Sequence, residues 1–136
     1  AMDGHTVNYI ILSDYGIKDY PNLIFATEDY LEKNPKIVEK FLAATEKGMK
    51  YSIEHNEAAV DATLKYDPPL NREAQLKTME VQNPLIFDGT TQIGWIRPES
   101  VEQTRQMLVG QHLLDKSANA SEAYTNSFLE KVYSDR

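Results

Sequence analysis

The chain has 136 residues, a formal net charge of −7, 41% hydrophobic residues and 26% charged residues, which fits one domain and argues against a disordered chain. No stretch approaches the roughly 20 apolar residues that a membrane span needs, and the acidic balance argues against nucleic-acid binding, which needs clustered basic groups. The absence of cysteine excludes disulfides, thiolate metal sites and thiol catalysis.

The first 27 residues predict two short strands joined by an aromatic loop. Val7 to Leu12 (VNYIIL) and Asn22 to Thr27 (NLIFAT) are apolar runs that are too short for helices. Between them, Ser13 to Pro21 (SDYGIKDYP) holds two Asp-Tyr pairs, a glycine and a proline, which are typical of a loop. Thr27 is expected to cap a short helical turn that follows. Two strands alone do not make a stable sheet, so this pair needs further partners.

A long amphipathic helix is predicted up to Asn56. Asn34 is expected to cap its first N–H groups, and Pro35 at the first helical position loses no hydrogen bond. Gly48 interrupts the helix at a cost of about 1 kcal/mol relative to alanine, which predicts the close approach of another backbone. Apolar or small side chains recur at helical spacing at Ile37, Val38, Phe41, Leu42, Thr45, Met49 and Ile53.

Four further helices are predicted in the remainder of the chain. Asn56 and Asn71 are expected to cap the first two of them, and Asn83-Pro84 to stop the second. A looped excursion from Leu85 to Arg97 separates the second and third helices. The expected helices are Glu57 to Tyr66, Arg72 to about Gln82, Pro98 to near Leu114, and Glu122 to Tyr133.

This element order predicts an α/β fold that is mostly helical within the segment and has about two short strands near its start. A parallel sheet would need crossover units that the chain does not contain. The helices are therefore expected to cover a sheet whose other strands lie outside these residues. Such a chain should expose apolar surface.

The sequence predicts no catalytic residue, metal site or cofactor. His5, His55 and His112 are widely spaced and match no metal-ligand pattern. There is no nucleophile elbow, phosphate-binding loop or dinucleotide-binding motif. His55 is explained more simply by its place near a helix C-terminus, where a cation is favoured.

The loop offers three candidate ligand-binding residues, Asp14, Tyr15 and Tyr20. Tyrosine supplies a flat stacking surface with a polar end, and aspartate can accept a hydrogen bond from an amine or ring N–H of a heterocycle. The alternative is that the tyrosines pack across a hinge and Asp14 caps a turn. Trp95 raises the same question, and packing is favoured there because isoleucines flank it.

The order of these motifs resembles a known family. The run IILSDYGIKDYPNLIFATEDYLEKNPKIVEKFLAATEKGMKYSIEHNEAAV, then GWIRPESVEQTRQMLVGQHLLDK and SEAYTNSFLEKVY, is similar to the C-terminal part of substrate-binding proteins related to fungal thiamine-pyrimidine synthase and to bacterial nitrate, sulfonate and taurine binders. The resemblance implies the C-terminal portion of a type II periplasmic-binding-protein fold. Residues 1–26 would end the second lobe and form the return crossing, and residues 27–136 would cover the first lobe, without a complete pocket.

The resemblance also implies a function. It predicts the solute-binding component of an ABC transporter, located in the periplasm or outside the cell or anchored to the membrane as a lipoprotein. The expected ligand is a thiamine-pyrimidine precursor, a riboflavin-like heterocycle or an anion. The expected partners are a membrane permease and either the missing N-terminal half or a second copy that associates by strand exchange. Two alternatives are a ligand-sensing domain of a signalling protein and a pyrimidine-precursor biosynthetic enzyme, although the synthase's active-site motif has no counterpart here.

Overall fold

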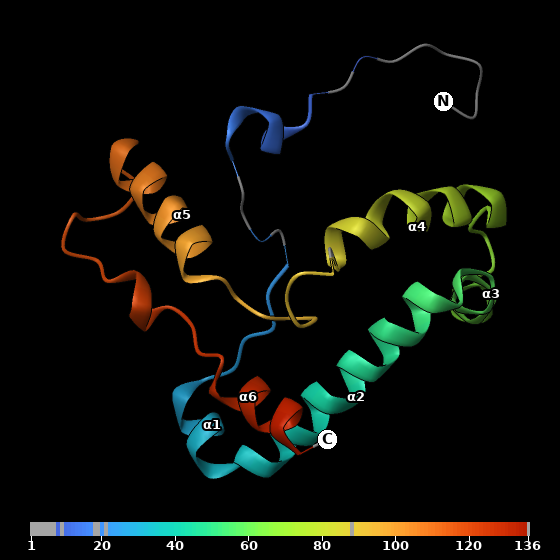
Figure 1. Cartoon of the computed structure of the whole chain (residues 1–136), viewed down its shortest axis with the longest axis horizontal. Coiled ribbons are helices and arrows are strands. Elements are labelled where there is room, and N and C mark those ends of the chain that lie inside the picture. Colours follow the sequence, from blue (N-terminus) through green and yellow to red (C-terminus); the bar gives the residue numbers. More distant parts are fainter. Residues whose placement is uncertain (1–7, 9, 18–19, 21, 88, 136) are drawn as a thin grey trace.

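The computed structural model describes the chain except for residues 1–7, 9, 18–19, 21, 88 and 136 (Figure 1). In the described part all regular elements are helical, which confirms the mostly helical prediction. In chain order they are η1 (Leu12–Tyr15), α1 (Glu28–Lys33), α2 (Pro35–Glu54), α3 (Asn56–Tyr66), α4 (Arg72–Ile86), α5 (Pro98–Gly110), η2 (Ala120–Glu122) and α6 (Ser127–Ser134).

The two predicted strands are absent from the residues that the structure describes. Asn22 to Thr27 is non-helical chain without a strand, and Phe25 within it is 93% exposed. Leu12 begins the short helix η1, and the remaining described residues of the first run form no strand, while Val7 and Tyr9 lie outside the described residues. A strand needs a neighbour for its backbone hydrogen bonds, and the described residues of these two runs have none.

The boundary between α1 and α2 depends on two side chains. The Thr27 hydroxyl accepts a hydrogen bond from the Tyr30 amide at 3.3 Å, which confirms the predicted cap of α1. Asn34 does not cap α2 as expected, because its amide nitrogen instead donates to the Tyr30 carbonyl at 3.2 Å. Pro35 starts α2 at the predicted position. Asn34 therefore closes α1, and the fixed backbone angle of Pro35 starts α2.

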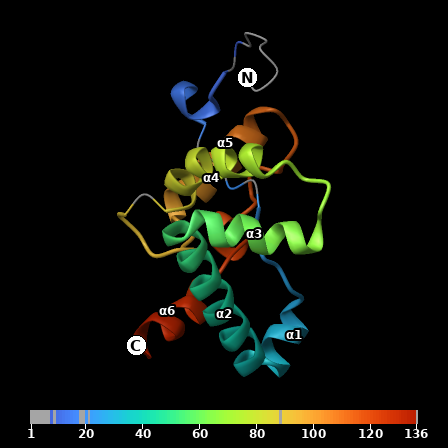
Figure 2. The same cartoon turned by 90° about the vertical axis from the view of Figure 1, so that its right-hand side faces the viewer.

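The main packing contact joins α2 to α6, which lie beside each other in Figures 1 and 2. Leu129 and Val132 of α6 are buried, at 8% exposure each. Glu39 of α2 is flanked by the ammonium groups of Lys36, at 2.8 Å, and Lys131 of α6, at 3.2 Å. The helix expected from Glu122 to Tyr133 begins later than predicted: α6 starts at Ser127, Glu122 ends η2, and residues 123–126 are non-helical.

Helices α3 and α4 form a second packed pair. Val60 of α3 is the most deeply buried apolar residue described, at 2% exposure. Asn56 does not cap α3 as predicted, since it lies within the helix and its side-chain oxygen accepts from Asn83 of α4 at 2.7 Å. Asp61 of α3 binds the Arg72 guanidinium of α4 at 2.7 Å.

The start of α4 matches its prediction and the end does not. The Asn71 side chain accepts from the Ala74 amide at 2.9 Å, as expected of a cap. Pro84 lies inside the helix, which continues to Ile86. A proline this close to the helix end removes one hydrogen bond from a turn that is about to stop, and the remaining bonds keep the turn helical.

The lead-in to α5 is held by the C-terminal segment. The Tyr133 hydroxyl donates to the Ile93 carbonyl at 2.9 Å, and Asn126 bonds the backbone of Ile96. Ile93 is buried, and Gly94 adopts a positive φ of 82°. From Pro98 helix α5 runs to Gly110, four residues short of the expected Leu114.

Much apolar surface is exposed, as the sequence predicts. Within the described ranges four apolar side chains are buried, namely those of Val60, Ile93, Leu129 and Val132. The predicted close approach at Gly48 is wrong for this structure, because a Cβ atom there would meet nothing within 4 Å. Gly48 lies on an exposed face of α2.

Candidate functional site

The predicted ligand-binding loop contains the short helix η1, which carries Asp14 and Tyr15. Both side chains are exposed, Tyr15 to 73%. Gly16 then turns the chain with a φ of 81°, and its carbonyl accepts a hydrogen bond from the Gln103 side chain of α5. The backbone of the loop is therefore attached to α5, while the two candidate side chains remain open to a ligand.

Tyr20 occupies a different environment from Tyr15. Its hydroxyl accepts a hydrogen bond from the Arg97 amide at 2.8 Å, and its side chain is half-buried. Arg97 immediately precedes α5. The structure thus brings Tyr20 to the residue that precedes α5. The assignment of Asp14, Tyr15 and Tyr20 to ligand binding stays a prediction.

Arg97 was not singled out from the sequence, yet it organises the segment before α5. One guanidinium nitrogen donates to the hydroxyls of Thr90 and Thr91, at 3.1 Å each. Trp95 is half-buried, and it lines a shallow hollow together with Gly89, Thr90, Thr91 and Gln92. Because the link from Arg97 to Thr90 spans seven residues of irregular chain, no helical or strand spacing predicts it.

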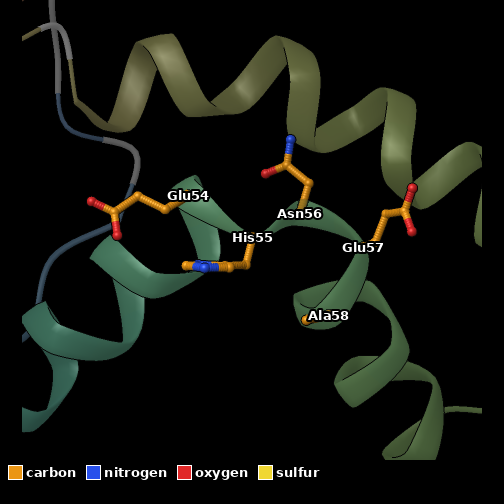
Figure 3. A pocket seen from close by; sticks show the side chains of 5 residues that line it. All are labelled: Glu54, His55, Asn56, Glu57 and Ala58. Carbon is orange, nitrogen blue, oxygen red and sulfur yellow. The ribbon is translucent and has the colours of Figure 1, made fainter.

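A second hollow lies at the junction of α2 and α3 (Figure 3). The His55 ring stacks on Tyr51 with centroids 4.3 Å apart, and its Nδ1 atom lies 3.1 Å from the Tyr51 carbonyl. This contact agrees with the expected place of His55 at a helix C-terminus. Figure 3 shows the two carboxylates of this hollow pointing away from each other, so they do not form an acid–base pair. The lining residues are Glu54, His55, Asn56, Glu57 and Ala58.

Neighbouring cations and hydrogen-bond donors explain the lowered pKa values of the carboxyl groups in the described residues. Hydrogen bonds from Arg105 and then Gln106 lower the pKa of Glu102 to about 2. The Arg72 guanidinium lowers the pKa of Asp61, and hydrogen bonds from Ser117 lower that of Asp115. A lowered pKa keeps each group ionised to a more acidic pH than usual, which suits ion pairing and turn capping better than proton transfer.

The described ranges contain no group of three histidine, aspartate or glutamate residues that could hold a metal ion. In the same ranges, no helix is both long enough and apolar enough to cross a membrane. What the geometry offers is a loop with exposed Asp14 and Tyr15, attached to α5 at Gly16 and Tyr20. This arrangement is suited to contact with a ligand or with another part of a protein.

Two comparisons with known proteins bear on this arrangement. Residues 1–59 match the family described as NMT1/THI5 like. Over 129 residues the chain is 22% identical to the formylaminopyrimidine-binding protein of Halalkalibacterium halodurans, in an alignment that covers 91% of this chain and 39% of that protein. The chain therefore spans about two fifths of the length of this relative. The family match covers less than half of the chain, so over residues 1–59 the chain is similar to the NMT1/THI5-like family.

Proposed function

We propose that the chain belongs to a solute-binding protein that captures a small pyrimidine-like heterocycle. The observation that carries this proposal is the similarity to a formylaminopyrimidine-binding protein, which runs over 91% of the chain. The family match over residues 1–59 covers the loop with Asp14, Tyr15 and Tyr20. The relative's name is that of a binding protein, which favours ligand capture over catalysis.

The structure supports a role for the loop in binding. Tyr15 exposes most of its ring for stacking, and Asp14 next to it can accept hydrogen bonds from the amino group of a pyrimidine. The attachments of Gly16 and Tyr20 to α5 limit the loop's freedom, so less ordering entropy is lost on binding. In this proposal, two lobes close around the ligand and binding favours the closed state.

The proposal extends to transport. A protein of this kind would work in the periplasm or outside the cell, free or as a lipoprotein, and deliver its ligand to the permease of an ABC transporter. In the same proposal, residues 1–26 form the end of the second lobe, and residues 27–136 cover the first lobe.

A thermal-shift assay of the full-length protein tests the ligand class. Formylaminopyrimidine, riboflavin, nitrate and taurine are compared, and a ligand at 100 times its Kd should add about 2.7 kcal/mol of stability. Tyr15→Ala should reduce the shift, whereas Tyr66→Ala, which removes another exposed ring at the end of α3, should leave it unchanged. A shift with none of the heterocycles would reject the proposal. Recovery of the bound pyrimidine unchanged after incubation would distinguish binding from turnover.

A further inference from the structure

The side chain of Gln103 links helix α5 to the candidate ligand-binding loop. Its amide nitrogen donates a hydrogen bond to the carbonyl of Gly16, 87 residues earlier in the chain. By contrast, Arg105 and Gln106 both donate to Glu102 of their own helix. Gln103 therefore joins two segments that are far apart in the sequence.

The peptide group between Gly16 and Ile17 is held from both sides. Its carbonyl accepts from Gln103, and its N–H, which belongs to Ile17, donates to the Leu12 carbonyl at 3.1 Å. A trans peptide group is planar, so its C=O and N–H cannot turn independently of each other. A hydrogen bond that fixes the carbonyl therefore also fixes the direction of the N–H.

This N–H closes the turn that contains the short helix η1, and with it Asp14 and Tyr15. Helix η1 has four residues, and hydrogen bonds in a 3-10 helix are poorly aligned. Its Leu12, Asp14 and Tyr15 side chains are exposed, Leu12 to 54% and Tyr15 to 73%. Because burial holds these side chains so little, the direction in which they point depends on the hydrogen bonds of the backbone.

The far end of the loop is attached at a different point. The Tyr20 hydroxyl accepts from the Arg97 amide at 2.8 Å, just before α5 begins. Gln103 acts four residues earlier in the loop, at Gly16, which follows η1 directly. Loss of the Gln103 bond should therefore release η1 while the attachment at Tyr20 remains.

We propose that Gln103 is a positioning residue of the ligand site. It orients the peptide group between Gly16 and Ile17 and thereby directs Asp14 and Tyr15 toward the ligand, which Gln103 itself does not contact. This inference rests on the proposed function, because it takes Asp14 and Tyr15 as the residues that contact the pyrimidine. A turn that is already oriented loses less conformational entropy on binding, so the ligand binds more tightly.

Hydrogen exchange in the ligand-free, full-length protein tests the orientation of the turn. Gln103→Met keeps the length and helix propensity of the side chain and removes its N–H donor. Exchange at the Ile17 amide should accelerate by about two- to tenfold, while exchange at the Arg97 amide stays close to that of the wild type. Gln111→Met makes the same change at an exposed residue just after α5 and should leave Ile17 exchange unchanged.

Calorimetric titration of the same proteins with formylaminopyrimidine tests the consequence for binding. The Kd should rise by about two- to tenfold in Gln103→Met, with the thermal midpoint of the ligand-free protein unchanged. Gln103 acts through the turn that carries Tyr15, so its loss should not combine independently with that of Tyr15→Ala. The double variant should bind more tightly than the product of the two single losses predicts.

Three results would overturn the role of Gln103: unchanged exchange at Ile17 in Gln103→Met, an unchanged Kd despite faster exchange, or independent losses in the double variant. Failure of the proposed function looks different. In that case the wild type itself binds no formylaminopyrimidine, and the ligand role of Gln103 fails with it. If the wild type binds and Gln103→Met binds equally well, the role of Gln103 fails alone.

Discussion

The side-chain amide of Asn126 pairs with both backbone polar groups of Ile96, thirty residues earlier. Its nitrogen donates to the Ile96 carbonyl at 2.8 Å, and its oxygen accepts from the Ile96 amide at 3.1 Å. This is the pairing that a neighbouring strand would provide, supplied here by one side chain. It fixes the extended chain before α5 against the residues that lead into α6.

Asn126→Ala should destabilise the chain by about 1–3 kcal/mol, because both groups of Ile96 lose their partner in a partly buried place. Urea unfolding monitored by the fluorescence of Trp95, the single tryptophan and a neighbour of Ile96 in sequence, measures the loss. Asn119→Ala is the matched control, since it removes an exposed local cap of η2. Equal losses for the two variants would argue against the pairing.

Leu129→Ala should destabilise the chain by about 2–5 kcal/mol, because Leu129 is one of the few apolar side chains buried in the described structure. Chemical denaturation followed by circular dichroism would show the loss as a lower midpoint. Leu113→Ala removes the same atoms from a side chain that is 69% exposed, and its midpoint should stay close to that of the wild type. If the two variants behaved alike, the α2–α6 contact would not be the stabilising core.

Two glycines should respond oppositely to the same substitution. Gly94→Ala places a side chain at a φ of 82°, with its Cβ 3.6 Å from Leu129 Cδ1, and should destabilise by about 1–2 kcal/mol. Gly48→Ala adds a Cβ in open space within α2 and should stabilise by about 1 kcal/mol through helix propensity. Thermal unfolding of the two variants and the wild type compares them. Destabilisation by Gly48→Ala would show that this face of α2 is covered.

The helices could be predicted well because their signals are local. Proline at the first helical position, the asparagine cap at Asn71 and the apolar periodicity of α2 involve residues within a few turns of one another. The strand prediction for Asn22 to Thr27 failed because pairing depends on a partner that local sequence does not supply. The same residues retain the composition of a strand without its hydrogen bonds.

The candidate site was predictable only in part. The motif predicts a loop, and within that loop Asp14 and Tyr15 lie in the short helix η1. The contact between Tyr20 and Arg97 joins residues 77 positions apart. The cap predictions for Asn34 and Asn56 were also wrong. Each side chain was expected to cap a helix, and each bonds another group instead. An asparagine side chain can both donate and accept, so Asn34 bonds a carbonyl four residues earlier, and Asn56 bonds its tertiary neighbour Asn83.

Acid should weaken the contact between α2 and α6. The hydrogen bond from Lys36, and then that from Lys131, lower the pKa of Glu39 from its ordinary value of 4.5, while burial acts in the opposite direction. A lowered folded-state pKa contributes stability that is present above pH 4.5 and is lost as the pH falls through the lower folded value. Glu39→Gln should therefore be less stable than the wild type at pH 7 and should lose less stability on acidification.

Urea midpoints at several pH values between 7 and 3 measure this difference. Glu32→Gln removes an exposed carboxylate from α1 and serves as the control, with the acid dependence of the wild type retained. Parallel pH profiles for Glu39→Gln and the wild type would show that Glu39 does not carry the effect.

Tyr20→Phe should loosen the loop at one defined atom. The substitution keeps the ring and removes the hydroxyl that accepts from the Arg97 amide at 2.8 Å, a loss of about 0.5–1.5 kcal/mol for a hydrogen bond of this type. Since about 1.4 kcal/mol corresponds to a factor of ten, hydrogen exchange at the Arg97 amide should accelerate by up to about tenfold. Exchange at Ile96, whose amide is bonded to Asn126, serves as the internal reference because it should change much less. Unchanged exchange at Arg97 would mean that Tyr20 does not hold the loop on α5, and Tyr20 would then be as available to a ligand as Tyr15 is.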